Sequence, residues 1–466
     1  MIIESEILIV GAGISGLATA WGLQRRGRDV QVIEAGSRAG GAIGSRREDG
    51  CLIETGPNST LETSPLIGEL LEQTGSAGAR IYANTSAKTR YVLRGGRLIP
   101  VPMSPPAFFA TPLFSWGTKL GLLREPFIRP APADAEETVA QFVRRRLGPE
   151  FLDYAINPFV AGVYAGDPAK LSVAAAFPRL VELERKYGSL IRGQILGARE
   201  RRRNPEKSKQ AAAMLSFRDG MQTLTDGIAG GLRRLGLSTR ATRLSRGAGG
   251  HWEVEAEGPQ GALRYRARCV VLATPAPAAA RLVQPLAGDA AVALEAIPYP
   301  PVAAVVSAYA RSDIAHGLDG FGFLVPERES RRILGTIFSS VLFENRAPEG
   351  TALLSTFVGG MRQPDLARQD EATVAALVHE ELAQLLGARA APRWTRVTRW
   401  PQAIPQYTLG HGARMAALEA AERELPGLFF CANYRGGISV ADCIKSAHAM
   451  AERVAGEFGA TAGAVR

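Results

Sequence analysis

Three glycines near the start of the chain have the spacing of a dinucleotide-binding turn. Gly11, Gly13 and Gly16 follow an apolar run ending at Val10 and open a helical pattern, and Glu34 lies 23 residues after Gly11. In such a turn the first glycine allows a tight bend, the second lets a pyrophosphate approach the backbone, and the third lets the helix pack on the strand. The N–H groups at the start of the helix attract phosphate, and the Glu34 carboxylate can accept hydrogen bonds from ribose hydroxyls.

A second glycine pair, Gly40–Gly41, follows Glu34, and a strand-like run over 51–56 then leads into the turn GPNST over 56–60. A nicotinamide-dependent dehydrogenase would continue directly with another strand–helix–strand unit. A glycine pair followed by a hairpin resembles instead the flavoprotein superfamily that binds FAD in an extended form. This interpretation places Arg38 at the pyrophosphate and the GPNST turn along the flavin. The alternative is an ordinary turn that binds nothing.

A third glycine pair, Gly436–Gly437, lies between an apolar run over 427–430 and a helical pattern over 441–455. Glycines at the entrance to a helix let backbone amides approach a ligand closely. Only about twenty residues follow this motif, too few to form a domain of their own. We therefore expect this turn to complete the binding site that the first segment begins.

The order of the expected elements divides the chain into parts. Alternating apolar and polar residues predict a hairpin and a buried strand over 237–246, 251–257 and 263–274. These strands are expected to return the chain to the nucleotide-binding part, which is therefore discontinuous. Further patterns predict a separate antiparallel sheet and a helix, at 302–309, 322–325, 334–339, 352–359 and 371–386.

The middle of the chain is open to more than one interpretation. Residues 104–127 mix aromatic and leucine side chains with basic ones, as in a helix lying on a membrane or in a packed helical lobe. Residues 138–174 predict a helix with a break at Pro158 and a glycine-rich loop ending at Asp167. The charged stretch 198–210 predicts a solvated loop, or else a patch for lipid headgroups.

Composition narrows the classes of partner. The net charge of +10 favours an anionic partner. Aromatic and basic residues are not interleaved as in nucleic-acid readers, so no nucleic acid is expected. The four cysteines form no C-x-x-C pair and the five histidines lack ligand spacing, so buried free thiols and no metal site are expected. No apolar run reaches about 18 residues and no signal-peptide pattern opens the chain, so a cytoplasmic location is expected.

Motifs along nearly the whole chain resemble those of the protoporphyrinogen oxidases, flavoenzymes of haem and chlorophyll synthesis. The second half is most similar to the plant mitochondrial type, and the double glycine of RGGIS also fits that type, whereas GPNST is more similar to bacterial members. The motifs that carry the resemblance occur in the family's order: RYVLRGGRL, VAGVYAGDPAKLSVAAAFP, GFGFLVP, LGTIFSSVLFENRAP, STFVGG and NYRGGISVADCI.

The resemblance implies an α/β protein with an additional α-helical part. A Rossmann-type FAD-binding domain is expected to be interleaved with an antiparallel-sheet substrate domain and a helical, membrane-associating lobe. The expected boundaries are 1–85, 211–295 and 399–466 for the FAD-binding domain, 86–103 and 296–398 for the substrate domain, and 104–210 for the lobe.

The resemblance also implies which residues bind FAD. Ala241 is expected at the adenine, where the family more often has Val, a change that a backbone contact tolerates. Trp400 is expected near the flavin, although a Trp–Pro pair could also simply stiffen a strand end. The implied set is Gly11, Ala12, Gly13, Ile14, Ser15, Gly16, Glu34, Ala35, Arg38, Gly41, Ala42, Gly56, Pro57, Asn58, Ser59, Ala241, Trp400, Gly437, Ile438 and Ser439.

For the substrate, the resemblance implies Arg90 as the partner of a propionate. Leu324, Ile337 and Phe357 are implied to sandwich the macrocycle, and the loop 162–167, which contains Gly166, is implied to border the same cavity. Without the resemblance, Ile337 and Phe357 would be core residues and Arg90 a surface cation. Asn58 is a weak candidate for guiding a pyrrole, and no other catalytic residue is expected.

The implied chemistry needs little from the protein. Loss of a hydride from a bridge carbon of protoporphyrinogen IX leaves a cation that two pyrroles stabilise, so FAD accepts the hydride and the protein supplies position. Three such steps give protoporphyrin IX, and O2 is reduced to H2O2. The alternatives are a coproporphyrinogen III oxidase, a flavin amine oxidase or desaturase, and a flavin-bound assembly protein. The expected partners are the porphyrinogen, O2 and the inner face of a membrane, and a homodimer is left open.

Overall fold

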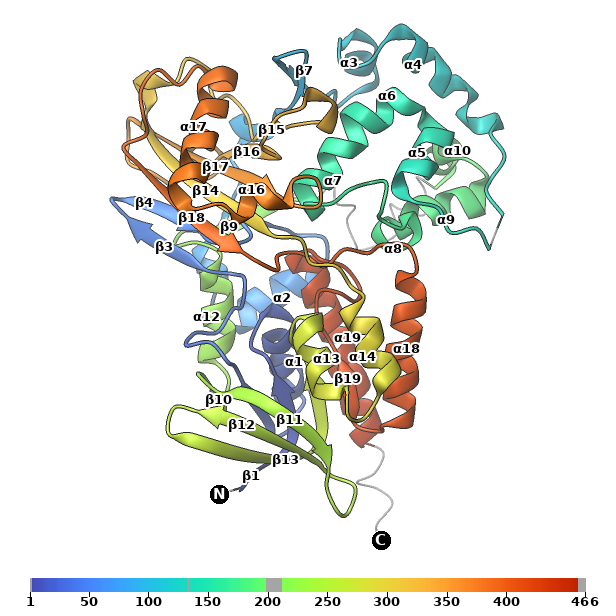
Figure 1. Ribbon diagram of the computed structural model, residues 1–466, viewed down its shortest axis with the longest axis vertical. Coiled ribbons are helices and arrows are strands. Elements are labelled where there is room, and N and C mark those ends of the chain that lie inside the picture. Colours follow the sequence, from blue (N-terminus) through green and yellow to red (C-terminus); the bar gives the residue numbers. More distant parts are fainter. Residues whose placement is uncertain (1, 133, 198–211, 460–466) are drawn as a thin grey trace.

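The computed structural model describes residues 2–132, 134–197 and 212–459. The molecule has three parts (Figure 1): a sheet flanked by helices at the bottom, a second sheet at the upper left, and a helical lobe at the upper right. The described helices reach no combination of length and apolar character that would cross a membrane. All four cysteines are buried and free, as their spacing predicts.

The first sheet has a parallel centre with an antiparallel hairpin at one edge. The apolar strand β1 lies in the middle, with helices on both faces, which is the usual environment of a parallel sheet. Ile7 and Ile9 pack under α1 (Ile14–Arg25) and α19 (Val440–Gly459), and Leu8 and Val10 pack on the opposite side. The strand order is β10 (Leu235–Gly236), β2 (Val30–Ile33), β1 (Ile2–Val10), β13 (Gly261–Leu272), β12 (Trp252–Gly258) and β11 (Arg240–Arg246), with β19 (Leu428–Phe430) also paired to β13.

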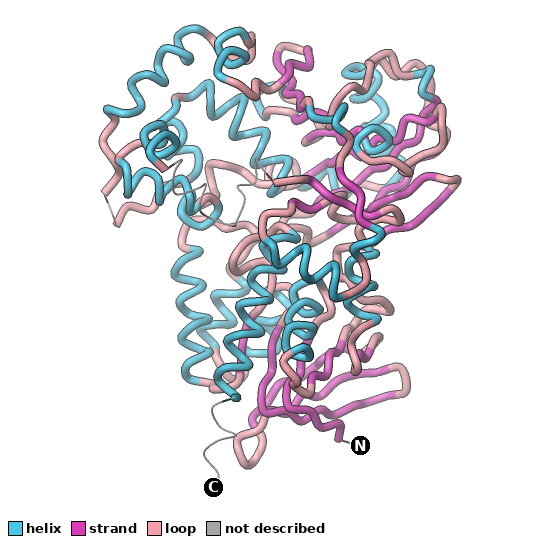
Figure 2. The backbone as a smooth tube through the Cα atoms, turned by 180° about the vertical axis from the view of Figure 1, so that it is seen from behind, coloured by secondary structure: helices cyan, strands magenta, loops and turns pink. Residues whose placement is uncertain are grey.

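The two ends of the chain meet in this first sheet. The strand β19 is parallel to β13, and β13 is parallel to β1. The helix α19 shares one hydrophobic core with α1, with Ile444 and Val454 packed in the same cluster as Leu17 and Leu23. The tube in Figure 2 shows the start of β1 and the end of α19 at the same end of the molecule. The opposite face is covered by α13 (Ala276–Val283), α14 (Gly288–Glu295) and α18 (His411–Glu424).

The second sheet is antiparallel except for one pair, β15 with β7. The helix α17 (Glu371–Leu386) covers one face, where Phe323, Phe338 and Val358 pack against Val374. The strands predicted in this region and the helix 371–386 are therefore found. The order is β18 (Trp394–Trp400), β14 (Val302–Ala310), β17 (Thr351–Gly359), β16 (Gly335–Phe338), β15 (Gly322–Leu324), β7 (Arg90–Arg94) and β8 (Arg97–Pro100).

Shorter elements connect these parts. The hairpin of β3 and β4 leads out of the first sheet, and a small sheet pairs β9 with both β5 and β6. Their bounds, with those of four helices, are β3 (Ser45–Glu48), β4 (Cys51–Glu54), β5 (Thr60–Leu61), α2 (Pro65–Gln73), β6 (Arg80–Tyr82), β9 (Met214–Phe217), α12 (Gln222–Gly230), α15 (Ser339–Leu342) and α16 (Pro364–Arg368).

The helical lobe differs from the sequence prediction in two places. Residues 104–127 do not form one helix, because α3 ends before Pro112, and Ser115 caps a separate helix, α4. No break occurs at Pro158, because a proline in the first turn of a helix needs no N–H partner; a π-helical turn precedes it instead. The charged stretch 198–210 lies outside the described residues. The helices are α3 (Pro105–Ala110), α4 (Trp116–Gly121), α5 (Val139–Leu147), α6 (Pro149–Phe151), α7 (Asn157–Tyr164), α8 (Val173–Ala176), α9 (Pro178–Tyr187) and α10 (Leu190–Leu196), with a 3-10 helix at Leu122–Phe127.

Candidate active site

The first glycine turn has the geometry that a pyrophosphate requires. Gly11 has a φ of +107°, which a residue with a side chain rarely adopts. A Cβ on Gly16 would lie 2.0 Å from the carbonyl oxygen of Gly11, so glycine is needed for α1 to pack against the end of β1. A Cβ on Gly13 would meet no atom within 4 Å. The backbone at Gly13 therefore faces open space at the N-terminus of α1, where an anion is stabilised.

Glu34 closes this turn from the end of β2. Its two carboxylate oxygens accept hydrogen bonds from the backbone N–H groups of Ala12 and Gly36, each at 2.7 Å. A carboxylate can accept about four hydrogen bonds, so it retains capacity for ribose hydroxyls. The backbone carbonyl of Glu34 accepts from the N–H of Thr239 at 2.7 Å, which brings the start of β11 and Ala241 beside the turn.

The second glycine pair lies directly against the first turn. The N–H of Gly40 donates to the carbonyl of Ala12 at 2.7 Å, and a Cβ on Gly41 would be 3.2 Å from the Cα of Gly13. Arg38 holds this loop by donating to the carbonyl oxygens of Ala39, Gly41 and Ile43. Its guanidinium thus shapes the loop in this structure, and its contact with a pyrophosphate stays a prediction.

The GPNST turn joins the glycine loops to the second sheet. A Cβ on Gly56 would be 2.0 Å from the carbonyl oxygen of Ala42, so these two segments are in close contact. The indole Nε1 of Trp400 donates to the carbonyl of Thr55 at 2.8 Å. The side-chain amide of Asn58 donates to the carbonyl of Gly56 at 3.4 Å. Trp400 therefore reaches the turn that the sequence places along the flavin.

The last glycine pair is held by a tyrosine that the sequence did not reveal. The hydroxyl of Tyr407 accepts from the N–H of Gly437 at 3.0 Å and donates to the carbonyl of Asn433 at 2.7 Å. The Gly437 amide is therefore already hydrogen-bonded within the protein. The expectation that this turn directs amides to a ligand then concerns its other amides. Ser439 caps α19 by accepting from the N–H of Asp442 at 3.2 Å. Within the described residues, the N–H groups of Ile438 and Ser439 have no acceptor.

The buried surroundings of Tyr407 explain why it holds this position. Its ring stacks on His411 with 4.1 Å between the ring centres. Burial raises the pKa of the Tyr407 hydroxyl, so this group remains a neutral donor and acceptor. Burial also lowers the pKa of His411 to about 4, which keeps the imidazole neutral.

These turns together fit a long dinucleotide. Open backbone at Gly13, unpaired amides at the start of α19, and spare acceptor capacity on Glu34 are the donor and acceptor set that a pyrophosphate with a ribose requires. Ile14 and Ser15 lie in the first turn of α1, and Ala35 follows Glu34 at the end of β2. Pro57 and Ser59 belong to the GPNST turn. The implied cofactor residues therefore come together from six separate segments of the chain.

The second sheet presents the implied substrate residues on one face. Directly paired residues share a face of a sheet, as do residues two apart. Gly335 pairs with Leu324 on one side and Phe357 on the other, and Ile337 lies two residues after Gly335. Along β16 and β17 the neighbours of Ile337 and Phe357 are buried, whereas these two side chains are partly exposed. Leu324, Ile337 and Phe357 thus form an apolar wall on the face opposite α17. Gly322 and Gly335 share this face, as does Ser355, which pairs with Ile337.

Arg90 lies at the edge of this wall, in register with Gly322 and through it with Ile337. Its guanidinium is exposed and lies 5.5 Å from the ring centre of Phe321. Among the described residues, none supplies Arg90 with a carboxylate partner. An exposed cation at the rim of an apolar wall can bind the carboxylate of a flat apolar ligand.

Gly162, not Gly166, is the glycine that contacts this wall. A Cβ on Gly162 would be 2.4 Å from a methyl group of Leu324. Gly166 is buried instead, and a Cβ there would be 2.7 Å from the side-chain oxygen of Gln406. Both glycines belong to the segment 162–167 that is expected beside the substrate; Gly162 contacts the wall, and the role of Gly166 at the substrate stays a prediction.

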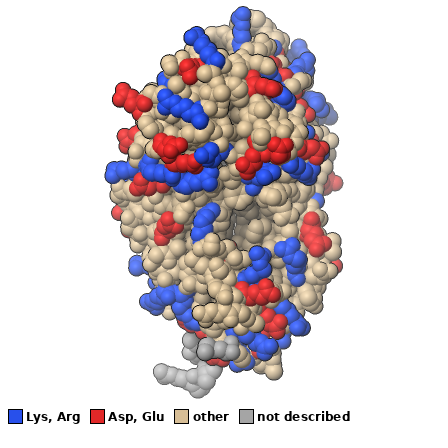
Figure 3. Space-filling model, turned by 60° about the vertical axis from the view of Figure 1, so that its left-hand side comes forward, with Lys and Arg blue, Asp and Glu red and all other residues tan. Residues whose placement is uncertain are grey.

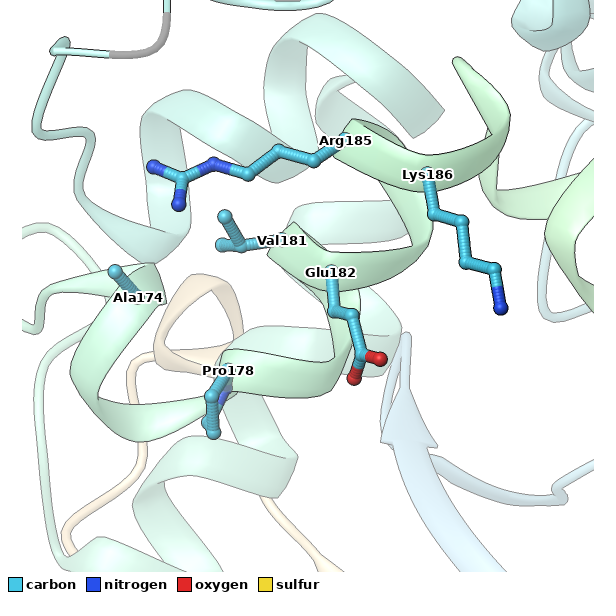
Figure 4. A pocket seen from close by; sticks show the side chains of 6 residues that line it. All are labelled: Ala174, Pro178, Val181, Glu182, Arg185 and Lys186. Carbon is cyan, nitrogen blue, oxygen red and sulfur yellow. The ribbon is translucent and has the colours of Figure 1, made fainter.

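Two cavities lie outside the glycine turns. One, of about 420 Å³, is on the helical lobe beside α8 and α9 (Figure 4) and contains none of the expected site residues; it is lined by Ala174, Pro178, Val181, Glu182, Arg185 and Lys186. The other, of about 10 Å³, is lined by Asn58 and Ile337 together with charged residues behind them. The surface in Figure 3 is hollowed near its middle, with Lys and Arg side chains around the hollow.

Comparison with known proteins identifies the family. Residues 14–455 match the family model described as flavin containing amine oxidoreductase. The chloroplastic protoporphyrinogen oxidase of Nicotiana tabacum is 36% identical, over 97% of this chain and 86% of the relative. The mitochondrial protoporphyrinogen oxidase of the same plant is 33% identical, over 95% and 93%. The coproporphyrinogen III oxidase of Bacillus subtilis is 27% identical, over 96% and 97%.

The solved structures agree with this family. A crystal structure from Exiguobacterium sp. 255-15, provisionally assigned as a protoporphyrinogen oxidase, superimposes with a TM-score of 0.81 at 26% identity, covering 98% of this chain and all of the other. FAD is therefore the cofactor, and the chain is an oxidoreductase. The chain belongs to the flavin-containing amine oxidoreductases and, within them, to the protoporphyrinogen oxidases.

Proposed function

We propose that this protein oxidises protoporphyrinogen IX to protoporphyrin IX in three two-electron steps, with O2 as the final acceptor and H2O2 as the by-product. The observation that carries the proposal is the apolar wall of Leu324, Ile337 and Phe357 with Arg90 at its rim. A tetrapyrrole with apolar faces and propionates on one edge matches a wall of this kind.

The residues of the chain supply position more than chemistry. Bound FAD supplies the acceptor for a hydride. Arg90 fixes the rotation of the macrocycle through one propionate, and the wall excludes water from the bridge carbon. Asn58 lies at the junction of both halves, where its side chain can guide a pyrrole N–H. Among the described residues, the carboxylate of Glu54 lies beside Ile337, but it already accepts hydrogen bonds from Ser45 and from the N–H of Met221. The pyrrole proton can therefore leave to water.

The number of cations at the wall favours protoporphyrinogen IX, which has two propionates, over coproporphyrinogen III, which has four. Arg90 serves one edge, while the next residues of the wall are apolar or glycine, apart from the uncharged Ser355. A second cation on this face, Arg396, is already paired with Glu48. Two additional propionates would therefore be desolvated without a charged partner, which is unfavourable.

The assay follows porphyrin fluorescence after either porphyrinogen is added to the purified FAD-containing enzyme in air. We expect a higher kcat/KM for protoporphyrinogen IX, with H2O2 formed in step. A higher kcat/KM for coproporphyrinogen III would move the chain to the alternative substrate. Product from neither substrate would refute the proposal.

We further propose that the helical lobe contacts the surface of a membrane from the cytoplasmic side. Trp116 is 64% exposed, Leu123 64% and Phe127 80%, and these residues lie within one short segment that also contains Arg124. Phe114 belongs to the core of the lobe instead, so it is unsuitable for a test of membrane contact.

The test is co-sedimentation with anionic liposomes. Trp116→Asp combined with Phe127→Asp should lower the bound fraction, whereas Val292→Asp, at an apolar site 66% exposed on α14, should not. Equal binding by both variants would favour a packed lobe without membrane contact. We also propose the domain boundaries that are expected from the sequence.

A further inference from the structure

A buried chain of polar residues lies behind Asn58, where the two halves of the molecule meet. Arg346 lies between α15 and β17 of the second sheet and is 3% exposed. Its guanidinium lies 3.7 Å from the buried carboxylate of Glu54 at the end of β4. The same guanidinium donates to the hydroxyl of Ser216 in β9 at 2.5 Å. That hydroxyl donates in turn to the backbone carbonyl of Asn58 at 3.2 Å.

Each member of this chain is fixed by further contacts. Glu54 accepts from the hydroxyl of Ser45 at 2.5 Å and from the N–H of Met221 at 2.9 Å. Arg346 also lies 5.0 Å from the ring centre of Phe343, and its own carbonyl accepts from the N–H of Leu52 at 2.8 Å. Three segments distant in sequence, 45–58, 216–221 and 343–346, are thus joined through one buried ion pair.

The position of this chain indicates its purpose. Glu54, Arg346, Asn58 and Ile337 line the same cavity of about 10 Å³, which is close to the minimum for one water molecule. The polar chain therefore packs directly against the turn and the wall and leaves no room for a water-filled channel. A buried ion pair contributes little to stability compared with apolar residues, but it defines geometry when all of its partners are present.

We propose that Ser216 and Arg346 are positioning residues that set the backbone of the Asn58 turn relative to the apolar wall. Glu54 holds Arg346, Arg346 orients the hydroxyl of Ser216, and this hydroxyl fixes the carbonyl of Asn58. The chain thereby couples the second sheet to the turn that lies along FAD. The inference rests on the proposed function only for the identity of the substrate.

The test compares two buried serines. Ser216→Ala removes the link to Asn58, whereas Ser307→Ala is a matched control, because Ser307 is 2% exposed in β14 and its hydroxyl bonds to the hydroxyl of Thr395. The readouts are the visible circular dichroism of bound FAD, the Kd for FAD, and the rate of anaerobic flavin reduction by protoporphyrinogen IX.

We expect Ser216→Ala to alter the dichroism and to slow flavin reduction by roughly tenfold, the factor that corresponds to about one buried hydrogen bond. KM should change by less than about twofold, because substrate binding by the wall and Arg90 is retained. Arg346→Lys should behave like Ser216→Ala, because lysine keeps the charge beside Glu54 and loses the second donor. Loss of FAD by Ser216→Ala alone would also support the proposal.

Two results would overturn the inference. One is a Ser216→Ala enzyme with the same dichroism and reduction rate as Ser307→Ala. The other is an Arg346→Lys enzyme with the full rate, since charge rather than the bond to Ser216 would then suffice. Should Ser216→Ala fail to fold, Ser216→Thr takes its place in the test, because threonine suits a strand and keeps the hydroxyl. Dichroism of bound FAD equal to that of the wild type would then support the proposal, and altered dichroism would refute it. If the wild type oxidises neither porphyrinogen, the proposed function fails, and the dichroism still tests the positioning.

Discussion

Alanine at Gly13 and alanine at Gly16 should have opposite effects, although both change one glycine of the same motif. Gly13 has φ −69° and ψ 174°, which alanine adopts without strain, and its Cβ would meet no atom within 4 Å. Gly13→Ala should therefore leave the apoprotein as stable as the wild type, or more stable by about 0.4–1 kcal/mol through reduced freedom of the unfolded chain.

The open space at Gly13 is what FAD is expected to occupy. A methyl group there would separate the pyrophosphate from the backbone N–H groups of the turn. Loss of one charge-assisted hydrogen bond corresponds to about 1.5–3 kcal/mol, or roughly a 10- to 150-fold increase in the Kd for FAD. Gly16→Ala should instead destabilise the apoprotein by at least about 1–3 kcal/mol, because its Cβ would lie 2.0 Å from the carbonyl oxygen of Gly11.

Urea unfolding of the flavin-free proteins measures the first effect, and quenching of FAD fluorescence on titration measures the second. Wild-type affinity in Gly13→Ala would show that the pyrophosphate does not pass over this residue. Equal destabilisation of both apoproteins would show that the space at Gly13 does not exist in solution. Either result would refute the placement of the cofactor.

Three other predictions concern the remaining parts of the site. Arg90→Ala should raise KM for protoporphyrinogen about tenfold with little change in kcat, because Arg90 binds substrate and transition state alike; the nearby exposed Arg97→Ala is the control, and equal falls in kcat and kcat/KM would contradict this role. Tyr407→Phe keeps the stacked ring but leaves the Gly437 amide unpaired, so FAD should bind about tenfold more weakly; unchanged affinity would contradict the bridge. Because the pKa of His411 is lowered to about 4 from 6.5, the unfolded chain binds its proton first, and unfolding free energy should fall by up to about 3 kcal/mol between pH 6.5 and 4; His411→Phe should lessen that fall in urea titrations.

Features that depend on neighbouring residues could be predicted from the sequence. The glycine motif, the strand before it and the helix after it lie within about twenty-five residues, and each has its own local pattern. The helix 371–386 was predicted with its observed ends, because Asp370 caps it and Gly387 follows in a left-handed conformation.

Features that depend on distant contacts could not be predicted in this way. Tyr407 bonds a turn thirty residues later, and Ser216 bonds Asn58 across 158 residues. No local signal marks either residue, since tyrosines and serines with these neighbours are common in loops and strands. In the segment 104–127, Pro112 was a local signal for the end of a helix, because a proline cannot continue one. The expectation of a single helix there rested on the apolar composition instead.

The way in which the site is assembled explains why its reacting part lies at a junction. The turns expected to hold FAD come from segments near residues 13, 40, 57 and 438, so a dinucleotide bound there would stabilise contacts that no single segment can form alone. The wall, in contrast, is built within one sheet and needs no cofactor to hold its shape. Among the described residues, the contacts that connect the two constructions near the wall include the Asn58 turn, Trp400 and two ion pairs, Glu54–Arg346 and Glu48–Arg396. A hydride moves over a distance far shorter than the length of either half of the molecule. The alignment of the two halves by these contacts therefore limits the reaction more than the chemistry of any single side chain does.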